Sequence, residues 1–124
     1  MSASEGDEGA VPAGTRVLIA APAEPPTPAA LDAARAALDG TLVVRRATYA
    51  MVGFEERAPV LTFGLELDRE LDDEATHAVF DAVAFAVMPH LAAGTAFNFL
   101  VVDEDLLAAF ERSTGPAFYV RSAA

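Results

Sequence analysis

The segment spanning residues 71–91 is the longest run of apolar and helix-favouring residues in the chain, and it constrains the fold more than any other segment. Wound at about 3.6 residues per turn, it gathers core-forming side chains on one side: Val79, Phe80, Val83, Val87 and Leu91. We expect that side to pack on a β-sheet. Asp72 is placed to cap the first turn, and Pro89, which lacks an amide hydrogen, should stop or kink the helix near Met88.

Phe85 and Met88 depart from this amphipathic pattern, because they lie three residues apart on the side that carries His77 and Asp81. Folded domains rarely leave large apolar side chains together on a polar face without a reason. One interpretation is that a loop, a chain terminus or the last strand covers the pair. The other is that the pair contacts another protein or a second copy of the chain.

The 124 residues are 53% hydrophobic and 22% charged, the composition of one compact soluble domain. We assign that domain to residues 15–124 and interpret residues 1–14, which are small, polar and acidic, as a disordered tail. No run is long and apolar enough to span a membrane and no secretion signal is recognisable, so a cytoplasmic location is expected. The absence of cysteine excludes disulfides, thiolate metal sites and a cysteine nucleophile.

Acidic residues outnumber basic ones by 19 to 8, which gives a formal net charge of -11. A strongly anionic chain is repelled by phosphate backbones and by anionic lipids, so neither nucleic acid nor a membrane is expected as a partner. The basic residues are all arginine and alanine is abundant, a composition typical of a GC-rich bacterial genome.

Five segments have the residue pattern of β-strands, at 16–21, 42–52, 60–68, 96–102 and 117–121. Besides the long helix, one helix is expected from Thr27 and Pro28 to a closing Gly40, and another begins after Asp103. Along 60–68, large apolar residues alternate with small or polar ones, as in a strand buried on one face only. Arg45 or Arg46 is placed to pair with Glu66 across neighbouring strands.

The first six elements follow the order strand, helix, strand, strand, helix, strand, which matches ferredoxin-like folds. We therefore predict an α+β, two-layer ferredoxin-like βαββαβ sandwich with an appended C-terminal helix and strand. Two helices would cover one face of an antiparallel sheet, whose other face would stay open. The strand at 96–102 is expected inside the sheet and the strand at 117–121 at its edge. The alternative is a mixed sheet with helices on both faces, in which the third helix buries Phe85 and Met88.

Four stretches, taken in order, resemble a known family: APAEP at 21–25, VRRATY at 44–49, LTFGLELD at 61–68 and PAFYVR at 116–121. Together they resemble the C-terminal domain of the SseB family, the bacterial enhanced serine sensitivity proteins. Family members often carry an additional N-terminal domain, which we expect this chain to lack, and their first strand usually ends in glycine where this chain has Ala21. The resemblance implies no catalytic residues.

Residues capable of catalysis or metal binding are present, but not in patterns that predict a site. His77 and Asp81 lie four apart on one helix face, a spacing at which both could bind one metal ion. His90 is thirteen residues beyond His77, and two ligands alone do not make a metal site. The acidic clusters at 72–74 and 103–105 occur at helix starts, where capping explains them. Prolines occupy the junction where a nucleotide-binding protein carries glycines. We predict no catalytic, cofactor-binding or metal-binding residue.

The resulting hypothesis is a non-catalytic protein-interaction module, with another protein or a second copy in a homodimer as its partner. The contact would use the open sheet face, the edge strand or the helical apolar pair, and the candidate contact residues are Phe85, Met88, Tyr119, Arg121 and Phe54. The alternative is a small-ligand sensing domain, for which the family name makes serine the first ligand to try. A small enzyme is a third, less favoured hypothesis.

Overall fold

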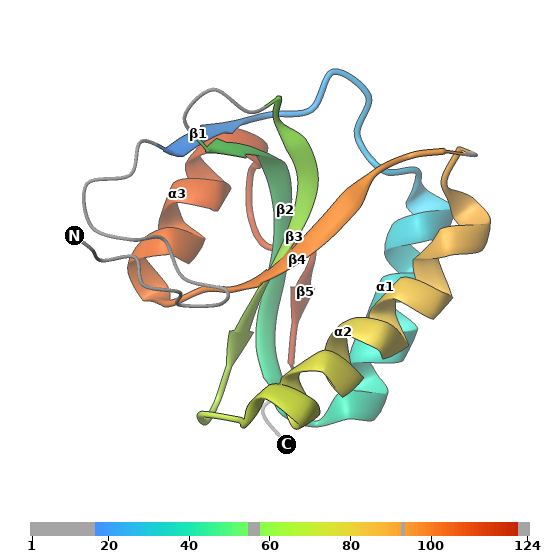
Figure 1. Ribbon diagram of the computed structural model, residues 1–124, viewed down its shortest axis with the longest axis vertical. Coiled ribbons are helices and arrows are strands. Elements are labelled where there is room, and N and C mark those ends of the chain that lie inside the picture. The colour runs from blue at the N-terminus through green and yellow to red at the C-terminus, as the bar shows by residue number, and fades with distance from the viewer. Residues whose placement is uncertain (1–16, 55–57, 93, 122–124) are drawn as a thin grey trace.

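The computed structural model describes residues 17–54, 58–92 and 94–121 (Figure 1). In chain order the elements are β1 (Val17–Ala20), α1 (Pro28–Thr41), β2 (Val44–Phe54), β3 (Val60–Leu67), α2 (Asp73–Val87), the 3-10 turn η1 (Met88–His90), β4 (Phe97–Val101), α3 (Glu104–Thr114) and β5 (Tyr119–Val120). Each expected helix and strand is present, although β5 is shorter than predicted. The local pattern of the sequence therefore suffices to place the elements.

Side-chain caps fix the start of each helix. Thr27 Oγ1 accepts a hydrogen bond from the amide of Ala30 at 3.2 Å, with Pro28 in the first turn of α1. Asp72 caps α2 and Asp103 caps α3 in the same way, each at 2.8 Å. At its other end α2 stops at Val87 and continues as the 3-10 turn around Pro89, as the missing amide hydrogen predicted.

The end of α1 differs from the expectation. Gly40 does not close the helix, because α1 continues to Thr41 and the residue with the left-handed backbone is Leu42, at φ 64°. Thr41 Oγ1 donates to the carbonyl oxygen of Leu38 at 2.8 Å, which ties the last turn together. The turn into β2 is then made two residues later, at an exposed leucine.

The sheet is mixed, with the strand order β1-β2-β3-β4, and β5 also pairs with β2. β1 occupies the Met51–Phe54 end of the outer edge of β2, and β5 occupies the Arg46–Ala47 part of the same edge. The pairs within β1-β2-β3 and the β2-β5 pair are antiparallel, whereas β3 and β4 run parallel because α2 connects them as a crossover. The α+β class is confirmed, but the ferredoxin-like topology is not.

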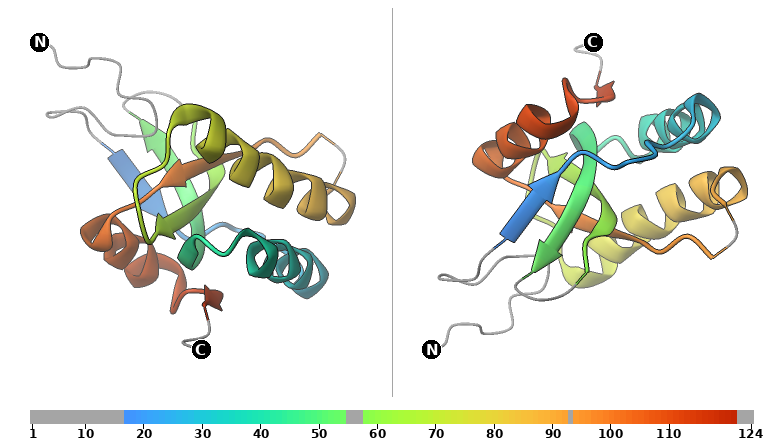
Figure 2. Two further views of the ribbon diagram at one scale, coloured as in Figure 1. Left: turned by 90° about the horizontal axis from the view of Figure 1, so that it is seen from below. Right: turned by 90° about the horizontal axis from the view of Figure 1, so that it is seen from above.

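Helices cover both faces of this sheet. Figures 1 and 2 show α1 and α2 side by side on one face and α3 on the other. Each face has its own core. The core under α1 and α2 is built from Ala34, Leu38, Val43, Val44, Ala47, Leu65, Val79, Val83, Val87 and Tyr119. The core under α3 contains Ala50, Val52, Leu100, Val102, Leu107 and Phe110.

The predicted open face of the sheet is therefore wrong. β3 is buried from Leu61 to Glu66, on both faces, because α3 lies on the side that was expected to meet solvent. Gly64 permits this approach: a Cβ at that position would lie 3.1 Å from Phe110 Cε2 and 3.1 Å from Val102 Cγ1. Since α3 packs on the face opposite α2, it does not bury Phe85 or Met88, as the two-faced alternative had required.

The predicted place of 96–102 inside the sheet is also wrong. Among the described residues, β4 pairs only with β3, so β4 is an edge strand. Its five residues, FNFLV, have the apolar composition of an inner strand. That composition does not predict how many strands pair with β4. The predicted edge strand, β5, does lie at an edge.

Candidate interaction surface

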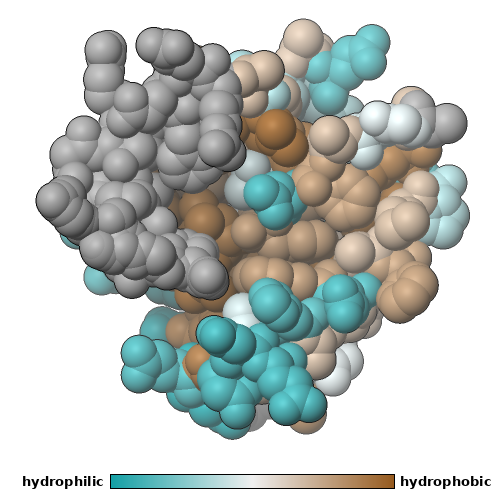
Figure 3. Space-filling view, in the orientation of Figure 1, coloured by the Kyte–Doolittle hydropathy of each residue, from teal (hydrophilic) through white to brown (hydrophobic). Residues whose placement is uncertain are grey.

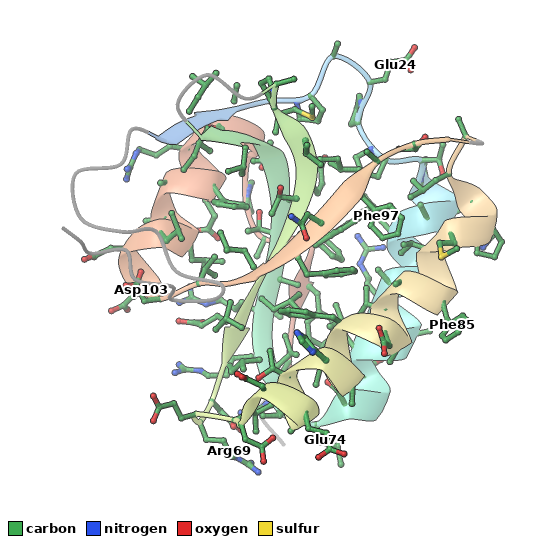
Figure 4. The ribbon with its side chains drawn as sticks, viewed as in Figure 1. Glu24, Arg69, Glu74, Phe85, Phe97 and Asp103 are labelled. Atoms are coloured by element: carbon green, nitrogen blue, oxygen red, sulfur yellow. The ribbon has the colours of Figure 1, made fainter. Side chains whose placement is uncertain are left out.

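Phe85 and Met88 lie on the outer side of the α2 and η1 segment, directed away from the sheet. The Phe85 side chain is 78% exposed and Met88 is 54% exposed. Figure 4 shows Phe85 projecting from α2 away from the core side. The prediction that both residues leave the core face is confirmed, and no segment within the described part of the chain covers them.

The neighbourhood of this pair on α2 is small and acidic. Ala78 and Ala82 are exposed beside Phe85, and Glu74 and Asp81 are exposed on the same outer side. α2 contains no lysine or arginine. The surface, which we call the α2 patch, therefore consists of Phe85 and Met88 with alanines on one flank and carboxylates on the other.

Tyr119 and Arg121, which were predicted as contact residues, are engaged inside the fold. Tyr119 is buried in the core under α1 and α2, and burial together with the adjacent Asp39 carboxylate raises the pKa of its phenol. Arg121 Nη1 donates to Asp68 Oδ2 at 2.7 Å and to the carbonyl oxygen of Leu42 at 3.0 Å. Their contacts tie β5 to the ends of β3 and α1.

Phe54, the remaining predicted contact residue, ends β2, where its backbone pairs with Val17. Its side chain lies outside the described residues. Glu55, Glu56 and Arg57, which follow it in the hairpin connection, lie outside them as well.

The residues considered for catalysis or metal binding are dispersed. His77 and Asp81 are exposed on α2 and His90 is exposed in η1. No group of three or more potential metal ligands occurs among the described residues. Asp72 and Asp103 cap α2 and α3, so the acidic clusters have the structural role assigned to them.

Three ion pairs to two carboxylates account for the carboxyl pKa shifts among the described residues. Arg46 Nε donates to Glu66 Oε1 at 2.7 Å and Nη2 to Oε2 at 3.1 Å, which lowers the pKa of Glu66 and raises that of Arg46. The hydrogen bond from Arg121, with a second one from Arg69, holds the pKa of Asp68 below its ordinary value. These groups are matched pairs that hold strands together, rather than an acid and a base facing one substrate. The predicted pairing of Glu66 is thus made by Arg46.

Comparison with protein families gives a match to the SseB protein C-terminal domain over residues 11–121. This match covers nearly the whole chain. The chain belongs to the SseB C-terminal domain family. Comparison with curated proteins and with solved structures gave no match. None of the described helices has the length and apolar character needed to cross a membrane.

In this SseB C-terminal domain, three of the four stretches that carried the resemblance meet in space. Residues 44–49 lie in β2, between 61–68 of β3 and 116–121 around β5. The Arg46–Glu66 and Arg121–Asp68 ion pairs join these stretches. The resemblance therefore follows the framework of the sheet, whereas the α2 patch lies outside all four stretches.

Proposed function

We propose that this SseB C-terminal domain is a non-catalytic protein-interaction module that binds another protein through the α2 patch. The exposure of Phe85 carries the proposal, because it is the most exposed large apolar side chain of the described residues. An exposed aromatic beside a second large apolar side chain is the composition of the centre of a protein interface. Aromatic residues of this kind supply a large share of binding energy when they enter a pocket on a partner.

The charge around the patch indicates what the partner presents. Asp81 and Glu74 border Phe85 and Met88, and the patch has no basic residue on α2 to offset them. A complementary surface would offer an apolar pocket with lysine or arginine at its rim. The overall charge of -11 favours encounter with such a surface.

The serine-sensing alternative gains no comparable support. The carboxylate of an amino-acid ligand is often held by an arginine, and four of the six described arginines are already engaged. Arg35, Arg46, Arg69 and Arg121 each donate to a carboxylate of the chain itself. A thermal-shift measurement with serine tests this alternative, since a ligand at about 100 times its Kd would stabilise the fold by about 2.7 kcal/mol.

Site-specific photo-crosslinking tests the proposed interface. The photoreactive amino acid p-benzoylphenylalanine is placed at position 85 and the full chain is expressed in the cells from which it comes. The matched control carries the same group at position 42, because Leu42 is similarly exposed at 72% but lies at the end of α1, outside the patch. A discrete crosslinked product is expected from position 85 and not from position 42.

Phe85→Asp provides the second arm of the test. Because Phe85 is exposed, its replacement should leave the melting temperature nearly unchanged while the partner captured by crosslinking at position 88 is lost. Equal products from positions 85 and 42, or a product at position 88 that Phe85→Asp leaves intact, would overturn the proposal.

A further inference from the structure

The outer edge of β4 carries backbone groups that no described strand pairs. The amide of Val102 donates to the carbonyl oxygen of Leu65 at 3.0 Å, so the backbone of Val102 points toward β3. Because backbone direction alternates along a strand, the N–H and C=O groups of Phe97, Phe99 and Val101 point the other way. The amide of Phe99 is satisfied by the side chain of its own neighbour, Asn98 Oδ1, at 3.0 Å.

The described residues of this edge lack two of the features that normally prevent strand pairing. Edge strands of soluble proteins are protected by charges, prolines or bulges, and β4 has no charged residue and no proline. In a chain of net charge -11, the whole stretch 82–102 contains no aspartate, glutamate, lysine or arginine. Figure 3 shows the same side of the molecule, where apolar residues extend across the middle of the view.

The apolar surface continues from β4 onto the adjoining side of α2. The Phe80 ring stacks on Phe99 with a centroid distance of 5.2 Å and an interplanar angle of 14°. This contact identifies the side of α2 that borders β4, and Ala84, one turn later, lies on that same side. Phe97 adds a T-shaped contact with Phe99 at 5.8 Å, and both rings remain partly exposed. The outer edge of β4 therefore offers both backbone hydrogen-bonding groups and apolar side chains to a binding partner.

We propose that a second copy of this chain binds here, with the two β4 strands paired antiparallel about a two-fold axis at Phe99. In that register Phe99 lies opposite its own counterpart and Phe97 lies opposite Val101. All three residues direct their backbone groups outward, so each Phe97–Val101 pair can exchange both hydrogen bonds. The Phe99 pair can do so once its amide leaves Asn98 Oδ1. The side chains that meet are apolar on both copies, as a self-complementary two-fold interface requires.

The distribution of charge selects a second copy over a basic partner. A cationic segment would find no carboxylate along 82–102, whereas an uncharged edge from an identical chain meets an uncharged edge. The same register places Asp103 of one copy opposite Thr95 of the other. The acidic starts of the two α3 helices therefore lie beyond opposite ends of the paired strands, where their repulsion is weakest.

Sedimentation equilibrium of the full chain tests the proposal, with the variant Val101→Pro. The wild type should have about twice the mass of the 12.9 kDa chain, and the variant the mass of one chain at the same concentration. Proline at 101 removes an amide hydrogen that β3 does not use, so the β3-β4 pairing is retained. Phe85→Asp is the matched control and should remain a dimer, since the α2 patch is a different surface.

Amide hydrogen exchange of the wild type decides the matter if Val101→Pro fails to fold. The amides of Phe97 and Val101 should exchange slowly at concentrations where the dimer forms, and faster on dilution to the single chain. A single-chain mass at every concentration would overturn the proposal, and so would a dimer in which these two amides exchange as fast as in the diluted protein. Slow exchange with a single-chain mass would also overturn it, because a segment of the same chain would then occupy the edge.

Discussion

Thr114 Oγ1 lies 2.8 Å from the carbonyl oxygen of Tyr49 and donates to it across the gap between β1 and β5. β1 pairs with Met51–Phe54 of β2 and β5 pairs with Arg46 and Ala47, so the carbonyl group of Tyr49 has no strand partner on this edge. The hydroxyl group also lies 3.1 Å from the carbonyl oxygen of Phe110, its own helical acceptor. The end of α3 thereby completes the edge of a sheet that two short strands leave unfinished.

Replacement of Thr114 by valine should destabilise the fold by about 1–2 kcal/mol, because a partly buried carbonyl oxygen loses its donor while the shape is kept. The free energy of unfolding is measured by urea denaturation. Thr114→Ser retains the hydroxyl group and is the control. A loss in Thr114→Ser with none in Thr114→Val would show that the methyl group, not the hydrogen bond, matters.

The starts of the helices were predictable because their causes are local. Asp72, Asp103 and Thr27 each cap a helix three residues before the amide that they accept, so a short stretch of sequence contains the whole interaction. The order of the strands depends instead on contacts between segments far apart in the chain. In the mixed sheet β3 lies beside β4, and α3 covers the second face. The alternation of large apolar with small or polar residues along β3 predicts neither arrangement.

One sequence signal for the second covered face was present at Gly64. A glycine inside an apolar strand often marks the close approach of another element. Here Phe110, fully buried, lies against the space that a side chain at 64 would need. Phe110 is 46 positions away from Gly64 in the sequence, so the glycine indicates a close contact but not which residue makes it.

Gly64→Ala should therefore lower the free energy of unfolding by about 1–2 kcal/mol, since the new methyl group pushes the side chains of Phe110 and Val102 away from β3. Thermal and urea denaturation measure the effect. Gly40→Ala is the matched control: a Cβ at Gly40 meets nothing within 4 Å, and alanine inside a helix should stabilise α1 by about 0.5–1 kcal/mol.

The double variant Gly64→Ala with Phe110→Leu distinguishes overpacking from a backbone effect. Leucine is smaller than phenylalanine near the added methyl group, so the loss in the double variant should be less than the sum of the two single losses. Strict additivity would contradict the contact between these two residues.

The candidate surface was predictable in part. Phe85 and Met88 were found because helical periodicity places them away from the core, a property of α2 alone. Tyr119 was misplaced because a short strand carries too little pattern to define its buried side. The edge of β4 was missed because an edge strand buried against helices has the composition of an inner strand.

Leu42→Gly should raise the stability of the fold. A residue other than glycine in the left-handed region costs about 1–2 kcal/mol of stability. Leu42, at φ 64°, is exposed, so packing of its side chain offsets little of this cost. The greater freedom of glycine in the unfolded chain reduces the gain to about 0.5–1 kcal/mol. Urea denaturation of Leu42→Gly against Leu42→Ala, which keeps the strain, measures it. A gain of the same size in both variants would assign the effect to the lost side chain instead.

Glu66→Gln tests the ion pair that joins β2 to β3 on the face covered by α3. The glutamate side chain is 9% exposed and accepts both hydrogen bonds from Arg46, which is 30% exposed. Glutamine keeps the shape but loses the charge and one acceptor, so we expect a loss of about 1–2 kcal/mol at pH 7. Glu74→Gln, at an exposed position of α2, is the control and should change stability little.

The pH dependence of the same variant gives a sharper test. Hydrogen bonding to Arg46 lowers the pKa of Glu66 below its ordinary value of 4.5 in the folded protein, so the unfolded chain takes up a proton first as the pH falls. The stabilisation by this pair is therefore complete well above pH 4.5 and is lost progressively below it, through the folded pKa. The difference in unfolding free energy between wild type and Glu66→Gln should shrink across that window. A difference that stays constant from pH 7 to pH 3 would show that shape and hydrogen-bond geometry, rather than the charge of Glu66, hold the two strands together.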